Sequence, residues 1–91
     1  MLFEWDEEKR ISNLLKHGFD FTDAETVFEG EIVTIDDDRF EYAEQRFVTL
    51  GLLNGKVVSI VHTERREKIR VISIRKASRD EERKYFKHIY D

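Results

Sequence analysis

The sequence predicts an α+β domain in which helices pack on an antiparallel, four-stranded sheet. β-branched runs gather in the second half of the 91-residue chain, whereas helix caps and helical spacing gather in the first half and at the end. A chain of this length buries one modest core, so we expect a single domain over residues 1–91. The expected order of elements is β-α-α-β-β-β-β-α.

The first two elements are a short strand and a helix. Residues 3–5 form an apolar and aromatic run that we expect at an edge of the sheet. Asp6 is typical of a residue that caps a helix N-terminus and Gly18 of the left-handed residue that ends one, so the helix covers residues 6–16. Its apolar stripe consists of Ile11, Leu14 and Leu15.

A second helix and an acidic segment follow. Residues 22–25 (TDAE) predict a capping box that opens a short helix to about Phe28. The next strand covers residues 31–35, and the three aspartates at 36–38 are too acidic for a sheet, so they predict a loop. An aspartate cluster could bind a divalent cation. These three lack the spacing and the turn glycine of a metal loop, so we favour an ordinary solvated loop.

The strongest pattern in the chain is a hairpin. Two β-branched runs, residues 57–63 and 69–74, flank the highly charged segment 64–68, as in two antiparallel strands joined by a turn. A preceding strand over residues 45–52 leads into the pair Asn54-Gly55, which favours a two-residue type I′ turn. Three consecutive strands therefore form the centre of the expected sheet.

The hairpin register decides which side chains can meet. If His62 pairs with Arg70, alternation places Arg70 and Arg75 on opposite faces, roughly 16 Å apart. They could not hold one phosphate together in that register, and sequence alone leaves the register open. A capping box at residues 78–81 opens the last helix, which carries Tyr85 on its apolar side.

The charge is divided unequally between the two halves of the chain. Residues 1–55 hold five basic and fourteen acidic side chains, whereas residues 56–91 hold eleven basic and six acidic ones. The basic half can meet phosphates and the acidic half can meet a basic partner, although solvated faces would give the same pattern. There is no Cys and no apolar run long enough to span a bilayer, so we expect a cytoplasmic protein without contact to a membrane.

Chemically active side chains are densest at the ends of the hairpin and of the first helix. They suit RNA cleavage by attack of the ribose 2′-OH on its own phosphate, which needs a base, an acid and positive charge, and needs no metal or cofactor. Imidazole can transfer protons near neutral pH, and the planar fork of arginine fits phosphate oxygens. The predicted catalytic residues are His62, His17, Arg65 and Arg75. Those predicted to bind RNA are Lys16, Arg70, Lys76 and Tyr85.

Structural roles compete with each of these assignments. A histidine at a strand end is more often a structural hydrogen-bonding group, and arginines in a hairpin turn are more often exposed charges. Other reaction classes find less support. The serines lack a nucleophile-elbow context, no glycine-rich phosphate loop is present, and the histidines lack the helical spacing of a zinc site.

The chain resembles the BrnT-like toxins, and the resemblance runs from about Phe3 to Tyr85. The matching residues are Phe3-Glu4-Trp5-Asp6, Lys9, Asn13, Lys16-His17-Gly18, Phe21, Ala24, Glu44 with Arg46, Gly51, His62-Thr63-Glu64-Arg65, Arg70-Val71-Ile72-Ser73 and Arg75-Lys76-Ala77. The resemblance implies a RelE-like fold and an endoribonuclease that arrests translation. It also implies a neutralising, BrnA-like antitoxin, through which the complex would bind operator DNA. The site residues rest on their own chemistry and not on the resemblance.

Two further hypotheses stay open. The protein could be a non-catalytic binding module that acts as scaffold or co-repressor with a DNA-binding antitoxin, which the acidic N-terminal half favours. It could also be a structural domain whose charges only solvate its surface. Growth arrest on expression of the protein alone separates a toxin from a co-repressor.

Overall fold

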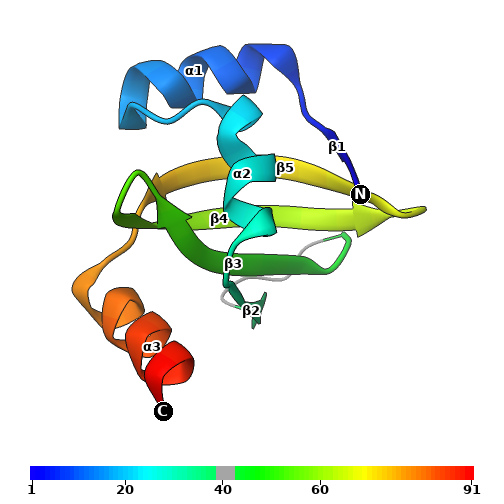
Figure 1. Ribbon diagram of the computed structural model, residues 1–91. Coiled ribbons are helices and arrows are strands. Elements are labelled where there is room, and N and C mark those ends of the chain that lie inside the picture. The colour runs from blue at the N-terminus through cyan, green and yellow to red at the C-terminus, as the bar shows by residue number, and fades with distance from the viewer. Residues whose placement is uncertain (39–42) are drawn as a thin grey trace.

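In the computed structural model, which describes residues 1–38 and 43–91, a five-stranded sheet carries helices on both faces (Figure 1). The order of strands across the sheet is β1-β5-β4-β3-β2. Two helices cover one face and the third covers part of the other. The strands are β1 (Leu2–Glu4), β2 (Val33–Asp37), β3 (Arg46–Leu53), β4 (Lys56–Arg65) and β5 (Lys68–Lys76). The helical elements are α1 (Glu7–His17), the 3₁₀ turn η1 (Phe21–Asp23), α2 (Ala24–Glu29) and α3 (Arg79–Tyr90).

The predicted α+β class and order of elements are confirmed, but the prediction of four antiparallel strands is wrong. β1 joins the sheet as a fifth strand and runs parallel to β5, with Leu2 opposite Lys68, so the sheet is mixed. A three-residue run carries no signal for its direction, which depends here on tertiary packing. The ring of Phe3 packs edge-on against Phe28 of α2 at 5.4 Å and anchors β1 at this edge.

Helix ends follow the sequence signals at two of three sites. Asp6 caps α1 by accepting from the Lys9 amide at 3.2 Å, and Ser78 and Glu81 form the capping box of α3. The capping box predicted at residues 22–25 is absent. Asp20 instead accepts from the Thr22 amide at 3.0 Å, so the helical segment begins earlier, with the turn η1.

The prediction that residues 36–38 form a loop is wrong for the first two of them. Asp36 and Asp37 continue β2, where they pair with Phe47 and Arg46 of β3. Asp37 is buried directly opposite Arg46. A cationic cross-strand neighbour makes a carboxylate tolerable in a strand, and single-segment propensity does not include that neighbour.

The β4–β5 hairpin contains an irregularity that changes the predicted register. Val61 pairs with Ser73, but His62 pairs with Val71, so Ile72 is an extra residue in β5. Thr63, and not His62, therefore stands opposite Arg70. The bulge returns both arginines, Arg70 and Arg75, to the face covered by α3, so the prediction that they lie on opposite faces is wrong.

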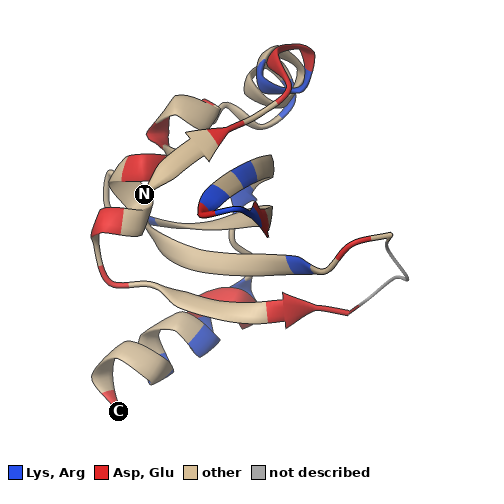
Figure 2. Ribbon diagram, turned by 90° about the vertical axis from the view of Figure 1, so that its right-hand side faces the viewer, with Lys and Arg blue, Asp and Glu red and all other residues tan. Residues whose placement is uncertain are grey.

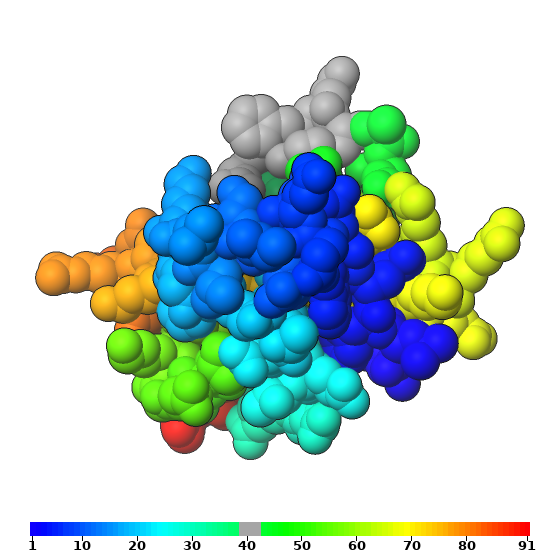
Figure 3. Space-filling view, turned by 90° about the horizontal axis from the view of Figure 1, so that it is seen from above, coloured from blue at the N-terminus to red at the C-terminus, as the bar shows by residue number. Residues whose placement is uncertain are grey.

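Helix α1 is attached to the sheet by a polar side chain. The amide of Asn13 donates to the carbonyl oxygens of Ile74 at 2.8 Å and Phe19 at 3.1 Å, and its Oδ1 accepts from the Ile74 amide at 3.2 Å. The predicted apolar stripe turns away from the sheet, because Asn13 takes the inward position. Viewed from above, α1 lies across the middle of the molecule (Figure 3). The exposed stripe consists of Ile11, Leu14 and Leu15.

Candidate functional site

His62 lies in the core beneath α2 and not at the surface. Its exposed fraction is 0%, and its ring is stacked on Phe47 at 5.7 Å and contacted edge-on by Phe28 at 5.2 Å. The Nε2 atom lies 2.7 Å from the hydroxyl of Thr49, which in turn lies 2.8 Å from the hydroxyl of Thr34. His62 is therefore enclosed by aromatic rings and a short chain of hydroxyl groups.

This position contradicts a catalytic His62 that touches RNA. Burial lowers the pKa of His62 to about 4, so the imidazole is neutral at pH 7. Its Nδ1 atom has no hydrogen-bond partner within the part of the chain that the structure describes. The side chain follows strand alternation, which directs residue 62 toward α2 and residues 63 and 65 toward the face that carries α3.

His17 and Lys16 are exposed at the C-terminus of α1, far from His62. Asn13 ties α1 to Ile74, which pairs with Ile60 of β4. Along α1, His17 lies four residues beyond Asn13, a distance of about 6 Å. Along β4, His62 lies two residues beyond Ile60 in the opposite direction, a distance of about 7 Å. The two imidazoles are thus more than about 10 Å apart, and the fold does not bring them together.

Arg75 is bound into the packing of α3. Its guanidinium donates to both carboxylate oxygens of Glu81, at 2.8 and 3.1 Å, and Glu81 also accepts from the Ser78 amide and the Ser59 hydroxyl. Burial raises the pKa of Glu81, but the bonds from Arg75 and Ser78 outweigh it and the net pKa is lowered. We call this region, defined by Ser59, Arg75 and Glu81, the covered end of the hairpin. Its hydrogen bonds attach α3 to the sheet, so its role is structural. Lys76 is the exposed last residue of β5 beside it.

The prediction that Tyr85 binds RNA is contradicted by its burial. Tyr85 is 1% exposed and packs α3 against the sheet, with its hydroxyl donating to the Glu31 carbonyl oxygen at 2.9 Å. Burial also raises the pKa of the phenol. Phe86 packs edge-on against this ring at 5.3 Å and is itself partly exposed. Tyr85 thus serves the core, as an apolar position at helical spacing commonly does.

Arg65 and Arg70 remain accessible on the face that carries α3. Arg65 makes a two-point contact with Glu44, with N–O distances of 2.8 and 2.9 Å, and the pair is exposed. These bonds from Arg65 hold the pKa of Glu44 below its ordinary value. Arg70 pairs with Glu4 of the neighbouring strand at 3.4 Å. Sequence reasoning missed Glu44 as a site residue, although it is among the residues that carry the family resemblance.

We call the region around Arg65 and Arg70 the open end of the hairpin, because none of the described helices covers it on this face. The helix on this face, α3, contacts β2, β3 and β4 and lies toward the other end. Figure 2 looks toward it and shows basic positions gathered on the β4–β5 hairpin and acidic ones at the end of β2. The turn beyond it holds Arg66 and Glu67 at φ of 48° and 69°, a conformation unfavourable for both residues. The open end consists of Glu4, Glu44, Arg65, Lys68 and Arg70.

The fold and the open end define a small α+β protein with exposed arginine–glutamate pairs at one end of its sheet. A family model described as the ribonuclease toxin BrnT of type II toxin–antitoxin systems matches residues 5–81, and the chain belongs to this family. The family implies an RNA substrate and an antitoxin partner. No curated protein matches the chain.

Over residues 1–38 and 43–91, no three His, Asp or Glu side chains are grouped to hold a metal ion. In the same part of the chain, no helix has the length and apolar content needed to cross a membrane.

Proposed function

We propose that this protein is an endoribonuclease toxin that cleaves RNA at the open end, without a metal, by attack of a ribose 2′-OH on the adjacent phosphate. The observation that carries the proposal is the exposed two-point pair between Arg65 and Glu44. A guanidinium in this geometry can exchange a carboxylate for a phosphate, because both present two oxygens to its parallel donors. Membership of a ribonuclease toxin family supports RNA as the ligand.

The pair supplies two of the functions that the reaction needs. When Arg65 moves to the phosphate, it stabilises the negative charge that develops on the phosphoryl oxygens. Glu44 then loses the contact that lowers its pKa, so its carboxylate becomes a better acceptor for the 2′-OH proton. Water at this exposed surface protonates the departing 5′ oxygen. Lys68 and Arg70 flank the pair and hold neighbouring phosphates.

This assignment replaces the imidazoles of the sequence-based hypothesis. His62 is enclosed in the core, and His17 lies toward the opposite end of the sheet. Arg65 and Arg70 keep their predicted roles, and Glu44 takes the role of general base. Arg75 becomes a structural residue because Glu81 occupies its donors.

RNA cleavage by the purified protein, freed of antitoxin, tests the proposal. We expect cleavage that is unaffected by a chelator and leaves 2′,3′-cyclic phosphate ends. Arg65→Ala and Glu44→Gln should each lower the rate about 100-fold, the typical effect of removing one charge-stabilising or proton-transfer group. Arg83→Ala is the matched control, because Arg83 is an exposed arginine of α3 that pairs with Asp80.

Each outcome of the assay decides a different part of the proposal. Loss of cleavage on chelation would refute the metal-free mechanism. Full activity of Arg65→Ala would refute the site, and intact RNA at high protein concentration would refute the enzyme. A substrate with a single 2′-deoxy sugar at the cleaved position should resist, because it lacks the attacking group.

The cellular role follows from this chemistry. Cleavage of translated RNA would inhibit translation in the cytoplasm, and a cognate BrnA-like antitoxin would neutralise the toxin and carry the complex to operator DNA. The RelE-like architecture that the resemblance implies is part of this proposal. Growth arrest on expression of the protein alone, relieved in Arg65→Ala, is the corresponding result in cells.

A second candidate function is a non-catalytic scaffold or co-repressor for a DNA-binding antitoxin. The observation in its favour is the dispersal of the imidazoles, since neither His62 nor His17 lies at the open end. Under this alternative the protein is harmless when expressed alone. Repressor activity of the complex should then be unchanged by Glu44→Gln.

A further inference from the structure

The outward face of α1 carries an unusual pattern for a surface helix. Leu15 is 83% exposed and Ile11 47% exposed, although the sequence places both where an apolar stripe is expected. They line a shallow depression of about 530 Å³ together with Glu8, Ser12 and Lys16. Isolated apolar residues are common on surfaces, but these two lie at i and i+4 and form one small apolar patch beside an acidic and a basic residue.

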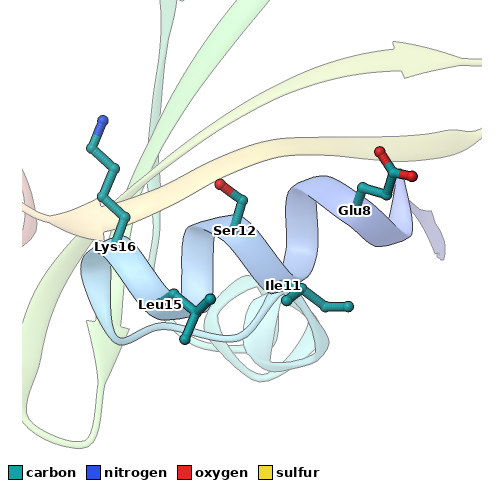
Figure 4. A pocket seen from close by; sticks show the side chains of 5 residues that line it. All are labelled: Glu8, Ile11, Ser12, Leu15 and Lys16. Carbon is teal, nitrogen blue, oxygen red and sulfur yellow. The ribbon is translucent and has the colours of Figure 1, made fainter.

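The five side chains form two rows along the helix (Figure 4). Glu8, Ser12 and Lys16 follow one another at four-residue steps on one side, and the apolar pair lies beside them. Glu8 and Lys16 are each about 6 Å along the axis from Ser12, in opposite directions. Among residues 1–38 and 43–91 neither of these two charges has an ion-pair partner.

We propose that this face of α1 binds the same face of a second copy, with the two helices antiparallel and a two-fold axis beside Ser12. A two-fold axis makes each row meet the same row of the other copy. Every contact between residue i of one copy and residue j of the other therefore occurs twice. Glu8 then faces Lys16 of the second copy, twice. The small side chain of Ser12 lies at the axis and lets the helices approach.

The apolar row satisfies the same symmetry. Measured along the helix from Ser12, Ile11 lies about 1.5 Å toward the N-terminus and Leu15 about 4.5 Å toward the C-terminus. In the antiparallel copy these positions are reversed, so Ile11 of one helix falls between Ile11 and Leu15 of the other. The four side chains interleave at about 3 Å intervals. One axis thus matches both charges and apolar groups, which is the argument for a second copy over an unrelated partner.

The contact is small, and this sets the kind of dimer expected. α1 has 11 residues and is about 16 Å long, so the pair buries less than the roughly 800 Å² per partner of a standard interface. The dimer should form and dissociate with concentration. It does not depend on the proposed ribonuclease activity, because the open end lies across the sheet from α1.

Sedimentation across a concentration series tests the dimer, with the full chain. The apparent mass should rise from 11.0 kDa toward twice that value, and Leu15→Glu should hold it at 11.0 kDa. Glu8→Lys and Lys16→Glu should each weaken association at least tenfold, and the double exchange should restore it. Leu52→Glu is the control, because Leu52 is an exposed leucine on β3 away from α1. Circular dichroism checks that each variant is folded.

The charge exchange makes the outcomes decisive. Restoration by the double variant can arise only if the two charges face each other between copies. A parent that stays monomeric at all concentrations overturns the proposal. A dimer that survives Leu15→Glu overturns it as well. If the parent is monomeric and Leu15→Glu abolishes binding of the antitoxin instead, the face belongs to the antitoxin and the dimer is refuted.

Discussion

The two ends of the β4–β5 hairpin carry the same chemistry, an arginine in a two-point contact with a glutamate, under opposite conditions. At the covered end, Arg75 and Glu81 are partly buried, and Glu81 also caps α3 and bonds Ser59. At the open end, Arg65 and Glu44 are exposed and bond mainly each other. A pair that shares partners with its surroundings stabilises the fold, whereas an exposed pair contributes little and is free to exchange partners.

The contrast extends through the thickness of the sheet. His62 lies under the open end, on the face covered by α2, and is as buried as the core around it. Arg65, three residues further on, is exposed on the opposite face. The open end therefore combines an exposed ionic surface with a buried layer beneath it. Three predictions test these differences, ordered by the size of the expected effect.

The largest effect should come from acidifying the protein, through His62. The pKa of His62 is about 4 in the folded protein and about 6.5 when unfolded, so the unfolded chain takes up the proton first. Stability should therefore fall as the pH drops from 6.5 to 4, by up to about 3 kcal/mol. Urea denaturation at a series of pH values measures this fall.

His62→Gln is the control for this prediction, because glutamine can bond Thr49 but does not titrate. Carboxylates whose pKa is lowered in the fold, such as Glu81, also stabilise the protein less once the pH falls below their ordinary pKa. This loss is the same in both proteins. The difference between the two curves therefore isolates the histidine. Identical pH dependence would contradict the prediction, as would an NMR titration that placed the pKa of His62 near 6.5.

The second prediction sets the two glutamates against each other. Glu81→Ala removes the bonds to Arg75, Ser59 and the Ser78 amide and should lower the free energy of unfolding by about 2 kcal/mol. Glu44→Ala should leave the urea midpoint unchanged, because its pair is exposed. RNA cleavage should show the reverse order, with Glu44→Ala the more damaging change. Equal midpoints for the two variants would remove the distinction between the ends.

Sequence predicted the elements well and their contacts poorly. Caps at Asp6 and Ser78 and the Asn54-Gly55 turn are local, and the structure has all three. The direction of β1 and the extra residue Ile72 depend on pairing between distant segments, which local pattern does not contain. Burial of His62 could not be predicted for the same reason, because alternation gives two faces but not which residues α2 covers.

The candidate site was predicted in part, for the same reason. Arg65 and Arg70 lie together because both belong to one hairpin, so sequence proximity was a fair guide. Glu44 reaches Arg65 from 21 positions away, and nothing in its own segment indicates that contact. His17 and Tyr85 lie elsewhere, because their places depend on where α1 and α3 pack, and the sequence of each helix does not contain that information.

The smallest effect concerns the two turns that close the hairpins. The β3–β4 turn uses Asn54 and Gly55, which accept positive φ, whereas the β4–β5 turn holds Arg66 and Glu67 there. Glu67→Gly should therefore raise the free energy of unfolding by about 1 kcal/mol, and Gly55→Ala should lower it by about as much. Urea midpoints measure both changes, and a loss of stability in Glu67→Gly would contradict strain at this turn.

RNA cleavage by Glu67→Gly then shows what the strain is for. The turn adjoins Arg65 and Lys68, and backbone strain is often retained where it fixes functional side chains. A more stable but less active Glu67→Gly protein would mean that the turn orients these cations for RNA. Unchanged activity would mean that the open end depends on its charges alone, because relieving the backbone would then leave Arg65 equally able to exchange Glu44 for a phosphate.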